Sequence, residues 1–551
     1  MITSDKLLRF LFAAVVLTIP LQKFFNISFI PFGNGPFVYF SLLALLISIF
    51  CLRDSENAFQ KFALKYFALY ILVLTISLLI GFLTFDYPKL YITAIGLNVQ
   101  RFIEYIYSFG INISIDNFSK IVVAYKAIIK DGIILGIFTF GTSFWIVKFF
   151  RNQWHDAFKI FSKCCIVIFS VCVVYSFVEF FYLKGYAWAT YMLMDINPLL
   201  YNIDFTASVT WPPLLWGNRM RSIFLEPSYC AIFLTSVIPM FLMYFLNLEK
   251  IKNKIIFYVI FTLLMFIIFA TNSKTAMVLI LFLCTYILFI GFLWRKTLLK
   301  RSFILIACVL IGCTGYFSLL RAAYIIPAEN PVVQWNIIKD IEKKMNIQYN
   351  EFPSQQYKEI NITEEKAKEK IITNNNVVDS YVNKNLSNLT DVNYGSNSSR
   401  YGVTFAELGV FLNNPILGTG SSELLQPYIY EHLPDFSDNE EVRRWTKFNW
   451  EHGIMTFQMP LLNDFSNKLA KNGIVGFITF YFPFIYFLLR IFRKREKLSL
   501  VDKQYIIALL AAFGCIFIGC MAGPLNLFFT YWVLLGILGA AAFSDYEKNA
   551  E

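Results

Sequence analysis

Long apolar stretches recur along almost the whole chain and alternate with shorter polar segments. Because about 20 apolar residues suffice to cross a bilayer as a helix, each such stretch predicts a membrane span. The pattern predicts about twelve spans, at residues 7–24, 36–52, 63–84, 127–148, 160–182, 228–247, 254–271, 275–294, 302–321, 470–491, 504–521 and 523–543. The predicted fold is therefore an all-α polytopic membrane protein.

The polar segments divide the predicted chain into three parts. Residues 1–321 hold the first nine predicted helices, with loops near 86–126 and 184–226. Residues 322–468 form one large loop, and residues 469–551 hold the last three helices and the C-terminus. Within the first long loop, residues 102–111 have an amphipathic pattern that is typical of a helix lying along the membrane interface.

Composition and charge support this assignment and give it an orientation. Of the 551 residues, 57% are hydrophobic and 15% are charged, whereas a soluble domain has about 25% charged residues. Lysine and arginine concentrate in alternate short loops, which places both chain termini in the cytoplasm and the large loop on the opposite side. One outward segment, 86–126, blurs this pattern because it contains four basic residues. The net charge of +11 is explained by loop anchoring, so no nucleic-acid partner is predicted.

Several kinds of chemistry have no support in the sequence. The ten cysteines lie in or beside predicted spans, and the large loop contains none, so no disulfide framework is expected there. Three scattered histidines do not make a metal site. There is no phosphate-binding P-loop and no dinucleotide-binding glycine pattern. We therefore predict neither a metal nor another cofactor.

The most informative segment is N-R-M-R-S-I-F-L-E-P-S, at residues 218–228. It places Arg219, Arg221 and Glu226 where an outer loop leads into a predicted span. Pro227 suits the first position of a helix, where its missing N–H costs nothing. The free backbone donors and the positive end of the helix dipole then face the same loop. Arginines beside a helix N-terminus predict a phosphate site.

Two further polar segments lie late in the large loop. Arg400 begins a predicted amphipathic helix in which Tyr401, Phe405, Leu408 and Leu412 recur at helical spacing. The block N-P-I-L-G-T-G follows at residues 414–420, and L-L-N-D-F follows at residues 461–465. By themselves, Arg400 could pair with a nearby carboxylate, and the last block could be an ordinary loop that leads into a helix.

Together these segments resemble the O-antigen ligase and polymerase superfamily, the Wzy-type glycosyltransferases of the bacterial envelope. The first is similar to the family motif R-x-x-G/S-x-F-x-E-P-S, with Arg219 and Ser222 in the matching positions. Lys274, in T-N-S-K, stands where the family has an arginine. Arg400 and the block at residues 414–418 match the second arginine and N-P-I-L-G. The resemblance covers about residues 200–480.

The resemblance implies a helical membrane fold of the GT-C type with one large periplasmic loop, in the bacterial inner membrane. Its donor and acceptor would be glycans linked to undecaprenyl pyrophosphate, with a chain-length regulator as a further partner. Planar guanidinium groups match a pyrophosphate, so Arg219 or Arg221, together with Arg400, would form a clamp. Lys274 and Asn463 are further substrate-binding candidates.

The identity of the general base stays open at this point. Ligases of this superfamily have a histidine directly before the asparagine that aligns with Asn463, but here that position is Leu462. Substitutes for this histidine are Glu226, Asp464, His432 and His452. Each of the four could instead have a structural role.

Three functions remain to be compared. A repeat-unit polymerase would transfer a growing lipid-linked glycan onto the next lipid-linked unit. A ligase would transfer glycan to lipid A-core, and Leu462 argues against it. A flippase would be expected to show internal repeats and ionisable groups within the spans, and no repeat is evident.

Overall fold

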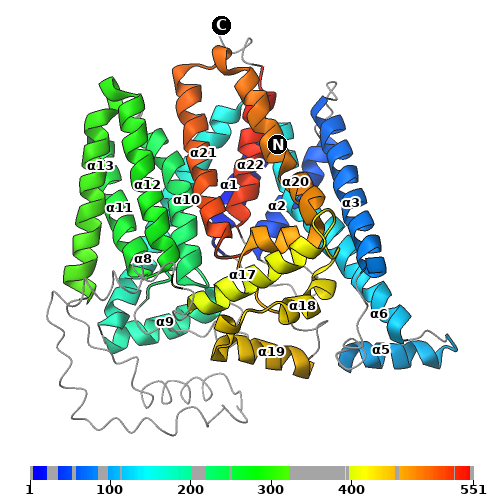
Figure 1. Cartoon of the computed structure of the whole chain (residues 1–551). Coiled ribbons are helices and arrows are strands. Elements are labelled where there is room, and N and C mark those ends of the chain that lie inside the picture. Colours follow the sequence, from blue (N-terminus) through cyan, green and yellow to red (C-terminus); the bar gives the residue numbers. More distant parts are fainter. Residues whose placement is uncertain are drawn as a thin grey trace, which may run out of the picture.

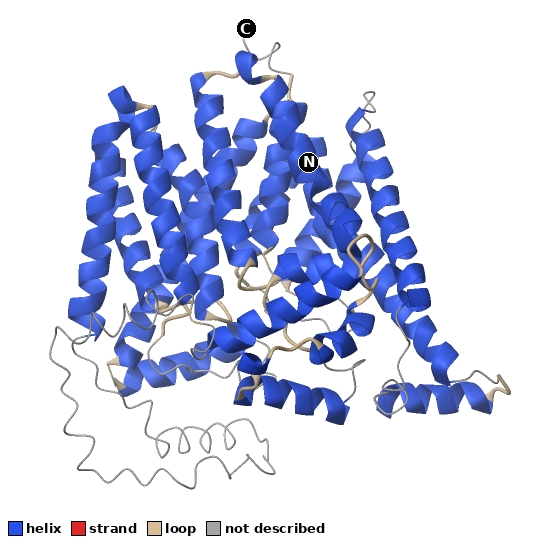
Figure 2. Ribbon diagram, viewed as in Figure 1, coloured by secondary structure: helices blue, strands red, loops and turns tan. Residues whose placement is uncertain are grey.

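We analysed a computed structural model of the chain. The structure describes residues 4–21, 35–51, 58–84, 97–111, 115–184, 186–200, 219–246, 251–321, 391, 396–452, 458–525 and 528–545. Within these residues the ordered elements are helices, and no strand occurs among them (Figure 2).

The helices in the first part of the chain are α1 (Ser4–Thr18), α2 (Pro36–Cys51), α3 (Ala58–Thr84), α5 (Leu97–Ser108), α6 (Ile115–Ala124), the π-helix η1 (Tyr125–Ile134), α7 (Leu135–Phe150), α8 (Trp154–Leu183) and α9 (Ala187–Leu200). The middle part contains α10 (Pro227–Leu246), α11 (Ile251–Ala270), α12 (Lys274–Leu293), α13 (Arg295–Gly315) and the π-helix η2 (Tyr316–Arg321). The last part contains α17 (Ser396–Asn413), α18 (Ser422–Glu431), the short 3-10 helix η4 (Asp435–Ser437), α19 (Glu440–His452), α20 (Asp464–Arg493), η5 (Arg495–Lys497), α21 (Leu500–Cys520) and α22 (Phe529–Phe543).

Seven helices in the described part of the chain are long and apolar enough to cross a membrane: α3, α8, α10, α12, residues 298–319, α20 and α21. Shorter apolar helices occur at 36–50, 254–270 and 529–543. These ten coincide with predicted spans, and the other two predicted spans coincide with α1 and with η1 and α7. The chain is a helical polytopic membrane protein, while the total of twelve spans stays a prediction.

The long helices run side by side, and the two chain termini lie toward the same end of the bundle (Figure 1). We call this end the terminal face. Helices α5, α9, α17, α18 and α19 lie across the other end, which we call the loop face. The amphipathic pattern near 102–111 is confirmed as a helix by α5. A short polar layer therefore covers one end of an apolar bundle.

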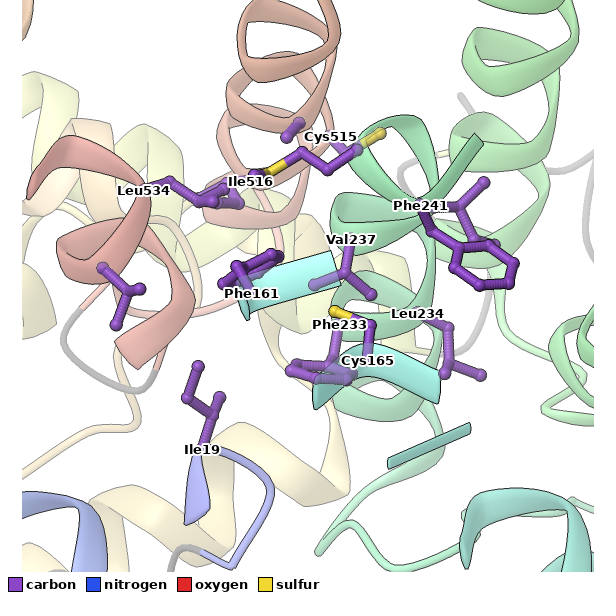
Figure 3. Close-up of a cluster of buried hydrophobic side chains, with 14 of the residues drawn as sticks. Ile19, Phe161, Cys165, Phe233, Leu234, Val237, Phe241, Cys515, Ile516 and Leu534 are labelled. Carbon is purple, nitrogen blue, oxygen red and sulfur yellow. The ribbon is translucent and has the colours of Figure 1, made fainter. Parts of the chain in front are cut away.

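The bundle core is built around α10 and α22. Side chains of α8, α10, α21 and α22 meet there, including Phe161, Phe233, Ile516 and Leu534 (Figure 3). Gly536 and Gly539 bring α22 close to α7. A Cβ at Gly536 would lie 2.7 Å from a side-chain atom of Ile146, and one at Gly539 would lie 2.6 Å from Val147. Such small residues are typical of helix contacts in membranes, where close backbone approach replaces the hydrophobic driving force.

A second, smaller core holds together α17, α18, η4 and α19, which we call the cap (residues 396–452). Its buried side chains are Val403, Ala406, Val410, Leu425, Ile429, Val442 and Trp445, joined by Met459 and Ala470. The predicted helix is confirmed by α17, but its buried face is not the predicted one, since Phe405 is 49% exposed and Leu412 is 73% exposed. The face with smaller residues is buried instead. It packs so closely that a Cβ at Gly402 would lie 2.2 Å from Ser437 of η4.

Candidate functional site

The loop that precedes α10, Arg219–Glu226, is held in place by a carboxylate from a neighbouring span. We call it the arginine loop. Glu179 of α8 accepts hydrogen bonds from the backbone N–H groups of Arg221 at 3.2 Å and Ser222 at 2.8 Å. The Ser222 hydroxyl donates to the carbonyl of Cys172 at 3.2 Å. The sequence did not predict this role of Glu179 as the support of the loop.

The two arginines of this loop have different surroundings. Arg221 is 3% exposed, donates to the carbonyl of Leu225 at 3.4 Å and lies where its charge acts on Glu179. Arg219 is only partly buried, and its charge acts on Glu226. Of the two candidates for a phosphate clamp, Arg219 is therefore the one beside the loop's acidic end, and Arg221 supports the loop from within.

Removing Glu179 is expected to destabilise the protein. In Glu179→Ala, the buried N–H groups of Arg221 and Ser222 lose their acceptor, and each such unsatisfied group costs about 1–3 kcal/mol. The thermal-unfolding midpoint of the purified protein in detergent should fall clearly. Asp438→Ala is the control, because Asp438 pairs with Arg443 on the exposed surface. Equal midpoints for the two variants would show that Glu179 does not support the loop.

Two non-glycine residues in left-handed conformations shape the backbone near this loop. Ser222 has φ of 51° and Asn272 has φ of 46°. Such values are uncommon for residues other than glycine and cluster at functional sites. The two segments are joined, because the Met220 N–H donates to the carbonyl of Ala270 at 2.9 Å. The arginine loop and the T-N-S-K turn thus form one surface.

The second arginine of the sequence motifs reaches the same place from the cap. Arg400 and Arg219 both act electrostatically on Glu226. Burial raises the pKa of Glu226 above its usual value, while a 3.2 Å hydrogen bond from Ser228 and the charges of Arg400 and Arg219 oppose the rise. The Arg400 guanidinium donates to the carbonyl of Ala522, in the turn between α21 and α22, at 2.9 Å. Residues far apart in sequence therefore make one charged site.

Lys274 adds a third cation to this surface. At the start of α12, its ammonium donates to Asn397 at 2.6 Å. Asn397 lies three residues before Arg400, so the two share one face of α17. We call Arg219, Glu226, Lys274 and Arg400 the arginine cluster.

Helix α17 is docked on α20 through a buried carboxyl. Glu407 is 1% exposed, and it accepts hydrogen bonds from the Ser466 hydroxyl and, at 2.7 Å, from the Asn467 amide. Burial raises its pKa to about 7, despite these two donors, and the nearby charge of Asp464 adds to the rise. This role of Glu407 was not predicted from the sequence.

This carboxyl predicts a pH-dependent stability. Between about pH 4.5 and 7 the folded protein keeps a proton on Glu407 that the unfolded chain releases, so the free energy of unfolding decreases as the pH rises. The full change is about 3 kcal/mol. Glu407→Gln, which resembles the protonated acid, should flatten this decrease in thermal-unfolding midpoints, whereas the exposed Glu431→Gln should leave it unchanged. A decrease that persists in Glu407→Gln would contradict this assignment.

The N-P-I-L-G-T-G block pairs with an interruption in α20. Gly473 has φ of 62° and ψ of −173°, which is not helical. Around it, the N–H of Ile474 donates to the carbonyl of Pro415 at 2.8 Å and the N–H of Thr419 donates to that of Ala470 at 3.0 Å. The segment 461–476 could have been an ordinary loop into a helix. Instead, backbone hydrogen bonds join it to the cap, and we call this contact the lock.

Asn463 and Asp464 take structural positions at the start of α20. The Asn463 side chain caps this helix by accepting from the N–H groups of Phe465 and Ser466. Asp464 has no exposed surface, and its oxygens accept from Lys468 at 2.7 Å, from the Tyr481 hydroxyl at 3.0 Å and from the Leu525 N–H at 2.9 Å. Asp464 thereby fixes the turn whose Ala522 carbonyl holds Arg400.

The histidine candidates lie elsewhere. His432 ends α18, with Nδ1 2.7 Å from the carbonyl of Tyr428 and Nε2 3.1 Å from the amide of Asn413. Asn413 is thirteen residues after Arg400, about 20 Å along a helix. His452 is the last residue of α19, and its side chain lies outside the described residues. Leu462, in the place of the ligase histidine, packs against the core of the cap.

The described part of the chain contains no set of side chains that could bind a metal ion. No group of three or more histidine, cysteine, aspartate or glutamate side chains there could hold a metal ion. The cysteines of this part are free thiols. The structure brings two arginines to one carboxyl, Glu226, and places Lys274 against the helix that carries one of these arginines. Such cations can bind an anionic phosphate group and stabilise charge that develops on it.

Comparison with known protein families matches one part of the chain. The family model described as O-antigen ligase (Wzy_C) matches residues 258–481. No curated protein matches the chain significantly. Lys274 and Arg400 lie within the matched residues, whereas Arg219 and Glu226 precede them. Residues 258–481 of this membrane protein therefore form a domain of the O-antigen ligase family.

Proposed function

We propose that this protein is a repeat-unit polymerase that acts on glycans linked to a lipid pyrophosphate. The family contains ligases and polymerases that transfer polysaccharide. The observation that supports the proposal is the arginine cluster, where the charges of Arg219 and Arg400 act on Glu226 and Lys274 binds Asn397 on the same helix as Arg400. A pyrophosphate leaving group needs such positive charge and no nucleotide.

The proposed reaction is a single transfer. The hydroxyl of the lipid-linked acceptor unit attacks the anomeric carbon of the donor glycan, a new C–O bond forms, and the bond to the lipid pyrophosphate breaks. Arg219 and Arg400 stabilise the charge that develops on the departing pyrophosphate, which is usually the largest catalytic contribution. Glu226 takes the proton of the attacking hydroxyl, because a raised pKa makes a carboxylate a stronger base.

Glu226→Gln should therefore lower the transfer rate by about 10²–10⁴-fold, the usual contribution of a general base. In the wild type the rate should increase with pH as the carboxyl ionises, since its pKa lies above the usual value for glutamate. That increase should be absent from the variant. A rate assay with purified protein over a pH series measures both effects, and a wild-type pH profile in Glu226→Gln would exclude the base.

In this proposal the arginine cluster faces the periplasm, and aromatic side chains near it contact the sugars. The alternation of basic loops places the loop face in the periplasm of a bacterial inner membrane. The cluster lies near that face, on which α9 presents Trp188, 45% exposed, and Tyr191, 55% exposed. Such aromatic rings suit stacking on sugars or anchoring in the interface. Trp211 and Trp216, in the same loop, lie outside the described residues.

A ligase is the second candidate, because the matching family model carries that description. Leu462 favours the polymerase, since it places an apolar side chain where the resemblance to ligases requires a histidine. The deciding experiment is the surface-glycan profile, on a gel, of a strain that lacks this protein. Single repeats on an intact acceptor identify a polymerase. Bare acceptor with polymer left on the carrier lipid identifies a ligase, and unpolymerised units held inside the cell identify a flippase.

A further inference from the structure

A large cavity lies far from the arginine cluster, in the half of the bundle nearer the terminal face. Its volume is about 580 Å³, and α2, α3, α7, α20 and α22 line it. Helix α3, which forms one wall, stands at the edge of the bundle (Figure 1). The rim residues Ile49, Leu64 and Ile137 are 49%, 71% and 38% exposed. The cavity is therefore a groove that opens sideways, where a spanning bundle meets the lipid.

The shape of this groove fits a single hydrocarbon chain. Along α7 it reaches from Gly136 to Lys148, which corresponds to about 18 Å of helix. That length is close to the thickness of one leaflet of the bilayer core, about 15 Å. A groove of this length can hold one extended acyl chain from one leaflet of the bilayer.

The walls are apolar, with phenylalanine rings at Phe59, Phe62, Phe67, Phe140, Phe144 and Phe487. Two glycines of α7 let groove-lining side chains pack closely against this helix. A Cβ at Gly136 would lie 2.7 Å from Phe67, and a Cβ at Gly141 would lie 3.0 Å from Leu45.

One end of the groove carries positive charge. Lys148, in the last turn of α7, lines the groove, is 8% exposed and donates to the carbonyl of Ser48 at 2.8 Å. Lys61 and Lys65 are exposed on the first turns of α3 at the same end. An ammonium group has three N–H donors, and basic residues at a membrane surface attract anionic lipid. An apolar groove with a basic end is complementary to an acyl chain with an anionic headgroup.

We propose that this groove binds one anionic glycerophospholipid from the leaflet at the terminal face, with an acyl chain along α7 and its phosphate beside Lys148. The site is separate from the arginine cluster and does not depend on the proposed polymerase activity. It would fix α3, which otherwise forms the edge of the bundle, to α7 and α20.

The test is native mass spectrometry of the purified full-length protein with phosphatidylglycerol and phosphatidylcholine at equal concentration. The wild type should retain one phosphatidylglycerol about fivefold in excess of phosphatidylcholine, the ratio expected for one basic residue beside an anionic lipid. Lys148→Met should reduce this preference, while the exposed Lys61 and Lys65 keep the weaker attraction of a basic surface for anionic lipid. Ala63→Trp, which places an indole in the groove, should lose both.

Leu72→Trp is the matched control, because Leu72 is 54% exposed on the same helix and does not line the groove. It should bind lipid as the wild type does. Equal retention of the two lipids by the wild type would overturn the charge-based assignment. Unchanged lipid binding by Ala63→Trp would overturn the site itself. This test does not depend on whether Lys148→Met folds. Preference for an undecaprenyl phosphate offered together with phosphatidylglycerol would assign the groove to the carrier lipid instead.

Discussion

Arg219→Ala and Arg400→Ala are each expected to reduce glycan transfer by about 10²–10³-fold, the usual effect of removing one group that stabilises transition-state charge. Both guanidinium groups act on Glu226, and they come from the arginine loop and from the cap. Each variant should remove the long polymer from the surface-glycan gel. The amount of each variant in the membrane, measured by immunoblot, should stay near the wild-type level.

Two comparisons make this prediction specific. Arg443→Ala removes an arginine from the cap that is exposed and paired with Asp438, so it should leave the polymer unchanged. Arg221→Ala should instead lower the stability of the protein, because Arg221 is buried beside Glu179. Normal polymer in both Arg219→Ala and Arg400→Ala would falsify the phosphate clamp.

Gly473→Ala is expected to abolish folding of the cap onto the membrane part and thereby to deplete the protein. A Cβ at this position would lie 2.2 Å from the carbonyl oxygen of Ile416, closer than real Cβ atoms come to any neighbour. Backbone atoms on both sides are held by hydrogen bonds, so neither segment can move away cheaply. The positive φ of 62° adds a further cost for a residue with a side chain.

Gly110→Ala separates these two costs. Gly110 also has a positive φ, of 76°, but nothing lies within 4 Å of a Cβ there. It should lose only about 1 kcal/mol, from the left-handed conformation alone, and remain in the membrane. Protein level and elution as a single species from a sizing column in detergent give the measurement. Similar amounts of Gly473→Ala and Gly110→Ala would show that the lock at α20 is not needed.

The spans could be predicted because apolar length determines them almost alone. Their ends were less accurate where local backbone geometry decides. The span predicted at 127–148 is divided between the π-helix η1 and α7, and α20 begins six residues before its predicted start of 470. The burial of α17 was predicted on the wrong face, because close packing against η4 selected small residues over large ones.

The candidate site was predictable only in part. Arginines and a glutamate beside a helix start were visible as motifs, whereas the phosphate clamp that they suggest stays a prediction. Glu179 and Glu407 were not assigned, because a single acid in an apolar segment does not reveal which backbone or amide groups it accepts from. The break at Gly473 was also hidden, since the glycine stands in a pattern that continues as helix on both sides.

The support of the arginine loop by α8 limits how this protein can be divided. The matched family domain begins at residue 258, but Arg219 and Glu226 come before it, in a loop that Glu179 holds through the N–H groups of Arg221 and Ser222. A chimaera that grafts only residues 258–481 onto a relative would bring Arg400 and leave Glu226 and Arg219 behind. A chimaera designed to exchange substrate specificity should therefore transfer α8, α10 and the matched domain together.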